Sequence, residues 1–460
     1  MRVRIEPGAR LHGDAAVPGD KSIAHRWLIL ATTASGPSRL LELPASLDVR
    51  STASCLAAVT SHARPALQAW ASNDGRGPEG RGSTWNGAIE VEGPNASPTA
   101  LEVEGDGRAG LVEPQGPLWC GNSGTTMRLL TGVLAAAPFE ARLAGDESLA
   151  ARPMERVADP LRAMGAVVET VDGHAPVTVR GGALHGADVA PATPSAQVKG
   201  AVLLAGVAAD GRTTVREPAP TRDHTERALR ALGAPVSIGD VVSVTRFQHE
   251  GFSATVPGDP SSAAFLVAAA ALTGSTLTLR DVGLNPTRVR YLEVMERMGV
   301  RTERRVEREE LGEPVGDLHV FPADGIRPVR VEGPELPLVI DEVPVLALLA
   351  AHARGDSRFL EAGELQLKES DRLNGIAEGI RDLGGEAAAE GPDLVVAGGG
   401  LEGGMVDARS DHRMAMAFAV TALGARQAIE VEGMEHAAVS FPGFTRTLRA
   451  LGARVEAVGG

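Results

Sequence analysis

The sequence has little of what several protein classes require. Its only two cysteines, Cys55 and Cys120, form no CxxC pair, so we expect neither a disulfide framework nor a cysteine-type zinc site. Aromatic residues make up 3%, too few for a surface that stacks bases or sugars. No apolar stretch approaches the ~18 residues of a membrane span, and the N-terminus MRVRIEPGAR lacks the apolar centre of a secretory signal. These absences predict a cytoplasmic protein that binds no membrane.

Positive charge is also in short supply. The chain has 45 Lys and Arg against 59 Asp and Glu, a net charge of −14. Proteins that bind nucleic acids or membrane surfaces need a positive field, so this balance argues against both functions. Small anions are not excluded, because helix N-termini and clustered cations act at short range.

The apolar content is ample, and it is arranged in repeats. With 460 residues and 43% hydrophobic residues, the chain can form two domains. A pattern of helix end, glycine and short strand recurs, as in LRAMGAVVE and LRALGARVE, and its glycines suit left-handed C-caps: Gly165, Gly233, Gly299, Gly384 and Gly452. The repeat predicts an α/β fold of six similar units, with a degenerate copy at Ser51–Trp70 and a surface insertion at Ser72–Gly87.

A second internal similarity divides the chain into halves. VPGDKSIAHR begins at Val17 and VPGDPSSAAF begins at Val256, and each precedes an apolar helix. Two copies of one strand–turn–helix motif predict two halves of similar architecture. The cleft between such halves is the expected place for a ligand.

Three predicted helices begin with small polar residues and a nearby cation. The segments that open them begin with Gly19-Asp20-Lys21-Ser22, with Gly121-Asn122-Ser123-Gly124 and with Ser195-Ala196-Gln197. Free backbone N–H groups and the positive end of the helix dipole make such starts suitable for oxyanions. Each start taken alone is also typical of an ordinary N-cap, but three of them together favour a ligand with two anionic groups.

The C-terminal half contributes charged clusters. LKESDRL contains Lys368, Glu369 and Arg372, and SDHRMAM contains Asp411, His412 and Arg413. The arginines suit bidentate binding of carboxylate or phosphate, and Glu369 is a candidate proton shuttle. The alternative for each cluster is a solvated helix face. Asp341, directly before an apolar helix, fits an N-cap and a general base equally well.

In combination and in order, these motifs resemble the EPSP synthase family of enolpyruvyl transferases. The resemblance extends along nearly the whole chain and includes GNSGTTMR, GDESLAARP, PSAQVKGAVLLAG, TRDHTE and IDEVPVLALLAA. It implies an inside-out α/β barrel of two domains with three repeated α/β units each. Residues 1–20 plus 252–460 would form one domain and residues 21–251 the other, with the substrate cleft between them.

The family's reaction transfers the enolpyruvyl group of phosphoenolpyruvate to the 5-hydroxyl of shikimate 3-phosphate and releases phosphate. The resemblance therefore implies these two small-molecule substrates, no cofactor and no metal, and we expect a monomer. It assigns to shikimate 3-phosphate Lys21, Ser22, Arg26, Ser195, Ala196, Gln197, Asp341 and Lys368. It assigns to phosphoenolpyruvate Lys21, Gly124, Arg152, Gln197, Arg372 and Arg413. The catalytic residues it implies are Lys21, Asp341 and Glu369.

Two departures from the family pattern affect this assignment. Ala196 stands where many members have a second serine, and Val439 stands where many have a lysine. Two other functions remain as alternatives. One is the related transferase that acts on UDP-N-acetylglucosamine, although that family has Lys-Asn where this chain has Lys21-Ser22. The other is a non-catalytic repeat protein that only binds phosphorylated ligands.

Overall fold

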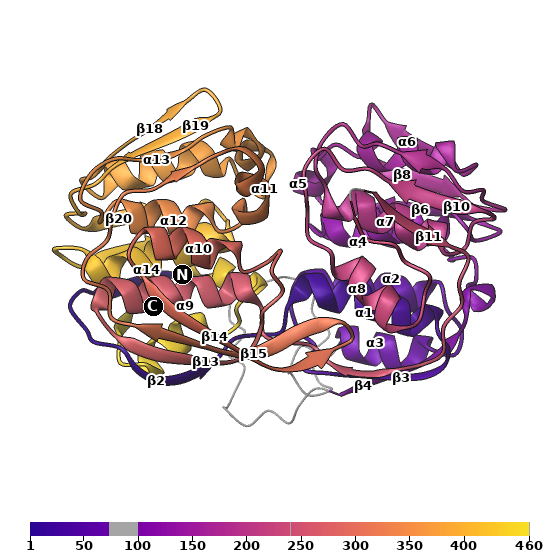
Figure 1. Ribbon diagram of the computed structural model, residues 1–460, viewed down its shortest axis with the longest axis horizontal. Helices are drawn as coiled ribbons and strands as arrows, with labels where there is room; N and C mark the ends of the chain where they lie inside the picture. Colours follow the sequence, from indigo (N-terminus) through magenta and orange to yellow (C-terminus); the bar gives the residue numbers. More distant parts are fainter. Residues whose placement is uncertain (73–99, 240, 460) are drawn as a thin grey trace.

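The computed structural model describes residues 1–72, 100–239 and 241–459, which form two lobes side by side (Figure 1). Buried apolar side chains form two separate clusters. The first lobe is built around the cluster of residues 23–256, and the second around residues 3–17 together with 263–455. Both chain ends therefore belong to the second lobe (Figure 1). Of the predicted insertion Ser72–Gly87, only Ser72 lies within the described residues.

The first lobe has three sheets, with strand orders β12-β3-β4, β5-β6-β8-β7 and β11-β10-β9. Its strands are β3 (Ser35–Leu41), β4 (Leu101–Asp106), β5 (Leu118–Trp119), β6 (Glu140–Ala144), β7 (Val167–Val171), β8 (His174–Arg180), β9 (Asp188–Val189), β10 (Arg212–Val215), β11 (Val242–Thr245) and β12 (Ser253–Thr255). Its helices are α1 (Lys21–Thr33), α2 (Leu47–Ala58), α3 (Arg64–Ser72), α4 (Gly124–Leu134), α5 (Glu147–Ala150), α6 (Glu155–Ala163), α7 (Ala196–Gly206) and α8 (His224–Ala231).

The second lobe also has three sheets, with orders β20-β21-β1-β22, β14-β15-β13-β2 and β16-β17-β19-β18. Its strands are β1 (Arg2–Glu6), β2 (His12–Ala16), β13 (Thr276–Gly283), β14 (Arg301–Glu310), β15 (Glu313–Phe321), β16 (Arg330–Val331), β17 (Ser357–Phe359), β18 (Glu386–Glu390), β19 (Asp393–Ala397), β20 (Gly404–Asp407), β21 (Ile429–Glu432) and β22 (Arg454–Val458). Its helices are α9 (Pro260–Thr273), α10 (Arg290–Arg297), α11 (Leu336–Val339), α12 (Val343–Ala350), α13 (Arg372–Asp382), α14 (His412–Thr421) and α15 (Phe444–Ala450).

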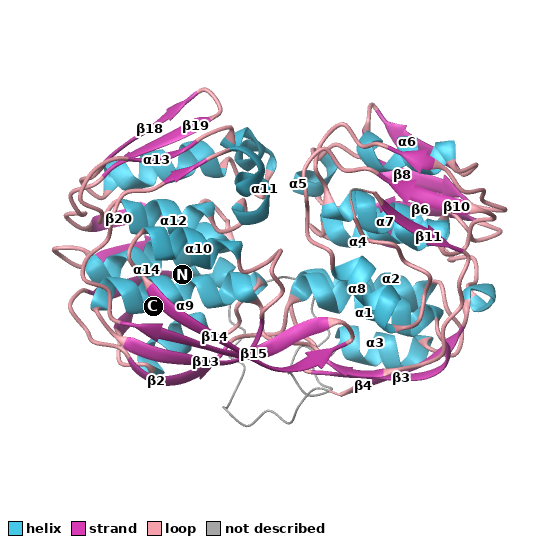
Figure 2. Ribbon diagram, in the orientation of Figure 1, coloured by secondary structure: helices cyan, strands magenta, loops and turns pink. Residues whose placement is uncertain are grey.

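Three helices that are apolar on nearly every side lie at the centre of each lobe. In the second lobe, α9, α12 and α14 pack against one another, and every residue of α12 and of α14 is buried. In the first lobe, α4 packs against both α1 and α7. A helix without a polar face has to be surrounded by protein, so the sheets lie outside these helices (Figure 2).

The outer helices α6, α8, α10, α13 and α15 carry the glycine pattern. All five predicted C-terminal glycines have positive φ, from 79° at Gly384 to 109° at Gly452. Residues with a Cβ rarely adopt this conformation, so the glycines end these helices. The prediction of five glycine C-caps is confirmed.

The two VPGD segments lie against each other where the chain crosses between the lobes. The Asp20 amide donates to the Pro257 carbonyl at 2.8 Å, and the Asp259 amide donates to the Pro18 carbonyl at 2.8 Å. The buried Arg288 then binds both carboxylates, with Nη1 at 2.6 Å from Asp20 and Nη2 at 2.9 Å from Asp259. Since Asp20 and Asp259 cap α1 and α9, one guanidinium joins the starts of a central helix from each lobe.

The fold is therefore mixed α/β, as predicted. The six sheets have open strand orders, and the described residues contain no closed barrel. None of the helices in the described ranges combines the length and the apolar character that a membrane crossing requires.

Candidate active site

The first lobe presents the N-terminus of α1 to the site. Asp20 caps this helix, with Oδ1 accepting the amide of Ser22 at 2.7 Å and that of Ile23 at 3.2 Å. Lys21 is the first helical residue, and its Nζ lies 3.0 Å from Oδ2 of Asp48 on the neighbouring helix α2. The ammonium group is thus held by a carboxylate of its own lobe.

Arg26 lies one turn further along α1 and reaches the start of α7. Its Nη1 donates to the Ser22 carbonyl at 2.7 Å, and its Nη2 donates to the Ala196 carbonyl at 3.3 Å. Its Nε donates to Oγ1 of Thr225 at 2.8 Å. Burial lowers the pKa of Arg26 to about 10. Ser195 caps α7, so the predicted residues of α1 and α7 lie together.

Gln197 and Gly124 connect α7 with α4. The Gln197 amide is fixed at both ends, because Oε1 accepts from Arg128 at 2.5 Å and Nε2 donates to Thr125 at 2.9 Å. A methyl group at Gly124 would lie 2.8 Å from Nη1 of Arg128 and 3.4 Å from Nη1 of Arg152. Two guanidinium groups therefore border the start of α4.

In the second lobe, Asp341 lies in the turn between α11 and α12 and is surrounded by cations. Arg222 of the first lobe approaches its Oδ2 to 2.5 Å, and Lys368, Arg372 and Arg413 lie at 3.7, 3.7 and 3.8 Å. Burial alone would raise the pKa of Asp341, but these cations, with Arg222 foremost, hold it well below its usual range. Asp341 does not cap the apolar helix, because Glu342 occupies that position, so the N-cap alternative is wrong.

Glu369 and Asp411 hold Arg372 between them. The Arg372 Nη2 lies 2.6 Å from Oε2 of Glu369, and its Nε lies 2.8 Å from Oδ2 of Asp411. Arg372 is 1% exposed, so a solvated helix face is the wrong interpretation for this residue. Asp411 also caps α14 by accepting the Arg413 amide at 2.8 Å. One buried carboxylate therefore holds the Arg372 guanidinium and the backbone of Arg413, whose own guanidinium donates to the Asp341 carbonyl at 2.9 Å.

The two halves of the site are close enough for their charges to act on one another. Burial opposes ionisation of Glu369, but its pKa is held well below the usual range by Arg372 and His412, and also by Arg152 and Lys21 of the first lobe. Together with the Arg222–Asp341 contact, this places Lys21, Arg152 and Arg222 of the first lobe near Glu369 and Asp341 of the second.

Three residues with close contacts in the site had no predicted role. Arg222 lies in the TRDHTE motif, Asp48 lies just before the degenerate repeat at Ser51–Trp70, and Arg128 ends GNSGTTMR. The motifs contained the signal, but the partners are remote in sequence: Arg222 and Asp341 are 119 residues apart.

Lowering the pH should weaken the protein through Glu369. Folding depresses the pKa of this carboxyl group, so its ionised form stabilises the fold above the ordinary pKa of roughly 4.3, and the contribution is lost as the pH falls through the folded pKa. We expect Glu369→Gln to lower the melting temperature at pH 7 and to change it less at pH 3, where part of this contribution is already lost. Exposed Glu104→Gln is the control and should have little effect at either pH. An equal loss at both pH values would contradict the ion pair.

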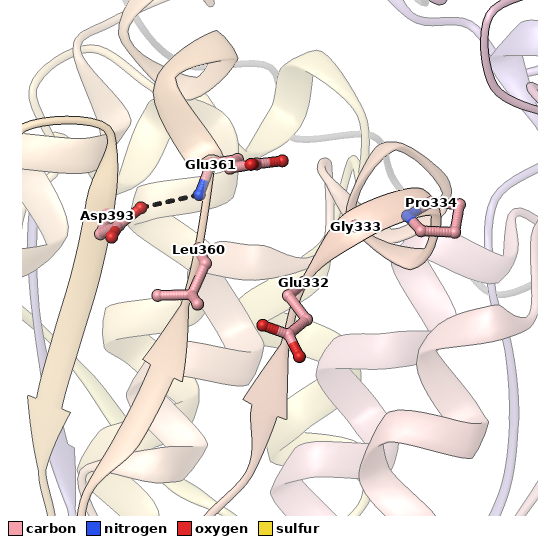
Figure 3. A pocket seen from close by; sticks show the side chains of 6 residues that line it. All are labelled: Glu332, Gly333, Pro334, Leu360, Glu361 and Asp393. Atoms are coloured by element: carbon pink, nitrogen blue, oxygen red, sulfur yellow. Dashed lines mark hydrogen bonds between the residues drawn. The ribbon is translucent and has the colours of Figure 1, made fainter.

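A separate hollow in the second lobe does not suit anionic ligands. It is lined by Glu332, Gly333, Pro334, Leu360, Glu361 and Asp393. Figure 3 shows three carboxylate side chains around it, and one oxygen of Asp393 accepts the Glu361 amide at 2.8 Å. Within the described residues, no group of three or more His, Cys, Asp and Glu could hold a metal ion. The site between the lobes is the one that concentrates positive charge.

The chain is similar to known proteins over its whole length. The family model described as EPSP synthase (3-phosphoshikimate 1-carboxyvinyltransferase) matches residues 5–70 and 89–448. A relative from Acidithiobacillus ferrooxidans, named 3-phosphoshikimate 1-carboxyvinyltransferase, is 43% identical over 99% of both chains. A relative of the same name from Halorhodospira halophila is 43% identical over 99% of this chain and 97% of its own.

Solved structures give the same result. An EPSP synthase from Acinetobacter baumannii superimposes with a TM-score of 0.81 and 35% identity, covering 99% of this chain and 100% of that one. The family model, the relatives and the solved structures thus identify the same family. The chain belongs to the EPSP synthase family.

Proposed function

We propose that this protein transfers the enolpyruvyl group of phosphoenolpyruvate to the 5-hydroxyl of shikimate 3-phosphate, within aromatic amino acid biosynthesis. The products are 5-enolpyruvylshikimate 3-phosphate and phosphate. The observation that carries the proposal is the meeting of basic side chains from both lobes around Asp341 and Glu369. The basic side chains suit two polyanionic substrates. The two carboxylates can move protons between those substrates.

The first lobe would bind shikimate 3-phosphate. Ser22 and Arg26 suit its carboxylate, since a guanidinium fixed through Nε leaves further N–H donors for a ligand. The N-terminus of α7, with Ser195 and Ala196, suits the phosphate, together with Lys368 from the second lobe. Ala196 offers no hydroxyl, so its contribution is the backbone.

Phosphoenolpyruvate would lie between the lobes. Its phosphate would meet Lys21, Arg152, Gln197 and the start of α4 at Gly124. Arg372 and Arg413 would hold its carboxylate. Asp411 orients the Arg372 guanidinium, and the Asp341 carbonyl orients that of Arg413. Closure of the lobes would then exclude water and strengthen each of these interactions.

The reaction would proceed by addition and elimination. Asp341 takes the proton of the 5-hydroxyl as the oxygen attacks C2 of phosphoenolpyruvate. Lys21 gives a proton to the methylene carbon, or Glu369 does so once the anionic substrates have neutralised the cations that hold its pKa low. The residue that gave the proton then takes one back from the methyl group of the tetrahedral intermediate as the C–O bond to phosphate breaks, and the proton on Asp341 leaves with the phosphate. The surrounding cations stabilise the charge that develops on the phosphate.

We infer further that the lobes are two domains, residues 1–20 plus 252–460 and residues 21–251, each an inside-out barrel of three repeated α/β units. The two separate cores and the three sheets around three central helices support this division, except that β12 pairs with β3 and packs in the core of the first lobe. We also propose that the protein acts as a monomer in the cytoplasm.

Phosphate release tests the function directly. The purified protein should release phosphate from phosphoenolpyruvate only when shikimate 3-phosphate is present. Release that depends on UDP-N-acetylglucosamine instead would favour the related transferase. Binding of both substrates without any phosphate release would indicate a binding protein and end the proposal.

Replacing Gly124 by Ala should weaken phosphoenolpyruvate binding specifically. The new methyl group would press on Nη1 of Arg128 at 2.8 Å and force that side chain to move. We expect KM for phosphoenolpyruvate to rise by about 10- to 100-fold, with KM for shikimate 3-phosphate little changed. Gly182→Ala is the matched control, because nothing lies within 4 Å of a methyl group there. Unchanged kinetics in Gly124→Ala would place the donor elsewhere.

A further inference from the structure

Two arginines beside the start of α4 have no carboxylate partner. Arg128 is 7% exposed, and it donates to the amide oxygen of Gln197 at 2.5 Å and to the Pro153 carbonyl at 3.2 Å. Arg152 donates to the amide oxygen of Asn122 at 2.5 Å. All these acceptors are neutral, and across the described ranges neither guanidinium makes an ion pair within 4 Å.

The two groups converge on one place. The position of a methyl group on Gly124 lies 2.8 Å from Nη1 of Arg128 and 3.4 Å from Nη1 of Arg152, so both nitrogens border the same small space. The Nε atoms of both arginines are also buried without a hydrogen-bond partner. The positive end of the α4 dipole adds to the field at this point.

Such an arrangement is costly without a ligand. A buried cation normally has a carboxylate partner, because desolvation penalises an uncompensated charge. Burial, and then the charges of Arg156 and Arg152, lower the pKa of Arg128 to about 9. Neighbouring like charges that lack counterions indicate a place where an anion binds.

We propose that Arg128 is a donor-binding residue that holds the phosphate of phosphoenolpyruvate together with Arg152. This rests on the proposed function, and it adds a cation that the sequence did not assign. A phosphate dianion in front of Gly124 would neutralise both guanidinium groups at once. Arg128 would also keep its bond to Gln197, because each terminal nitrogen of a guanidinium has two N–H groups.

Inorganic phosphate and phosphoenolpyruvate are the probes, used with the full-length protein. In Arg128→Gln, which removes the charge but keeps an amide donor, we expect KM for phosphoenolpyruvate to rise by about 10- to 100-fold. The Kd of inorganic phosphate, measured with shikimate 3-phosphate bound, should rise by a similar factor. The Kd of shikimate 3-phosphate alone should stay within about twofold, because Arg128 binds the donor. Arg108→Gln is the control: Arg108 lies in the same lobe, donates to the Leu204 carbonyl, and should change none of these constants.

Two results would overturn the proposal. Unchanged affinities for both phosphoenolpyruvate and phosphate would show that Arg128 does not contact the donor. An equal loss of shikimate 3-phosphate affinity would show that Arg128 acts only by positioning Gln197. Removing Arg128 leaves no carboxylate unpaired, so the variant should fold. If it does not fold, Arg128→Lys repeats the test, because an ammonium group cannot bind Gln197 and the anion in the same geometry. In that variant KM for phosphoenolpyruvate should still rise several-fold. An unchanged KM would overturn the proposal.

The wild-type protein separates this proposal from the proposed function. Phosphate release that depends on shikimate 3-phosphate tests the function alone. If the wild type shows no release but its binding of inorganic phosphate depends on Arg128, the function fails and the anion site stands. If the wild type releases phosphate and Arg128→Gln binds phosphoenolpyruvate normally, the proposed function stands and the role of Arg128 fails.

Discussion

Replacing Asp341 by Asn is expected to lower kcat by about 10²- to 10⁴-fold, the usual contribution of a general base. The change removes the group that would accept the 5-hydroxyl proton, but it keeps the size of the side chain. Substrate affinity should not fall, because the cations around Asp341 remain and lose a competing carboxylate. Steady-state kinetics with both substrates varied would measure the two effects separately.

Asp324→Asn is the control, since Asp324 is an exposed aspartate of the same lobe. Near-normal turnover in Asp341→Asn would remove Asp341 from the mechanism. A loss confined to KM would make it a substrate-binding residue only.

The pH dependence of kcat and of kcat/KM should also reveal Asp341 as the base. In the free protein the cations around Asp341, with Arg222 foremost, outweigh burial and hold its pKa well below its usual range, which makes it a weak base. Anionic substrates would neutralise those cations, so the pKa of Asp341 should rise in the complex. We therefore expect the acidic limb of kcat, which reports the complex, to lie at higher pH than the acidic limb of kcat/KM, which reports the free protein. Coincident limbs would contradict this role of the cations.

Replacing Arg372 by Met should have the second large effect, on both stability and activity. The guanidinium is 1% exposed and holds Asp411, which is 0% exposed. Its loss leaves a buried carboxylate with no paired cation, only hydrogen bonds from Ser370 and the Arg413 amide. Breaking such a pair costs about 3–5 kcal/mol. Turnover should fall below detection, because the carboxylate of phosphoenolpyruvate also loses its partner. Urea unfolding and the phosphate-release assay measure the two losses.

Two further variants distinguish charge from geometry at this position. Arg372→Lys keeps the positive charge but loses the two parallel N–H groups of the guanidinium. Its stability should therefore lie between those of the wild type and Arg372→Met, and its activity should still be strongly reduced. Arg381→Met, at the exposed end of the same helix, should change neither property. A stable, inactive Arg372→Met would show that Asp411 does not depend on Arg372.

Local chemistry explains what could be predicted from the sequence. The glycine C-caps follow from the absence of a Cβ, and each lies where the helix–glycine–strand pattern put it. The three helix starts at Lys21, Gly124 and Ala196 depend only on neighbouring Asp or Ser side chains. The duplicated VPGD motif indicated two halves, and its copies do lie against each other.

Contacts between remote segments explain what could not be predicted. The sequence left Asp341 between a cap and a base, since the cations around it come from three other segments of the chain. It left the Arg372 cluster open because burial depends on how α13 packs, not on the spacing of charges. The strand orders of the sheets, which join β1 to β21, were likewise beyond any local pattern.

The position of β1 has a consequence for how the protein is made. Arg2–Glu6 is the second element from the edge of its sheet, paired with Ile429–Glu432 on one side and Arg454–Val458 on the other. The first strand to be synthesised therefore cannot form its sheet until the last two have been made. At ordinary rates of synthesis this interval is on the order of 20 to 90 s. The lobe of residues 23–256 can complete its core during that time, so the nascent chain should acquire protease resistance there first.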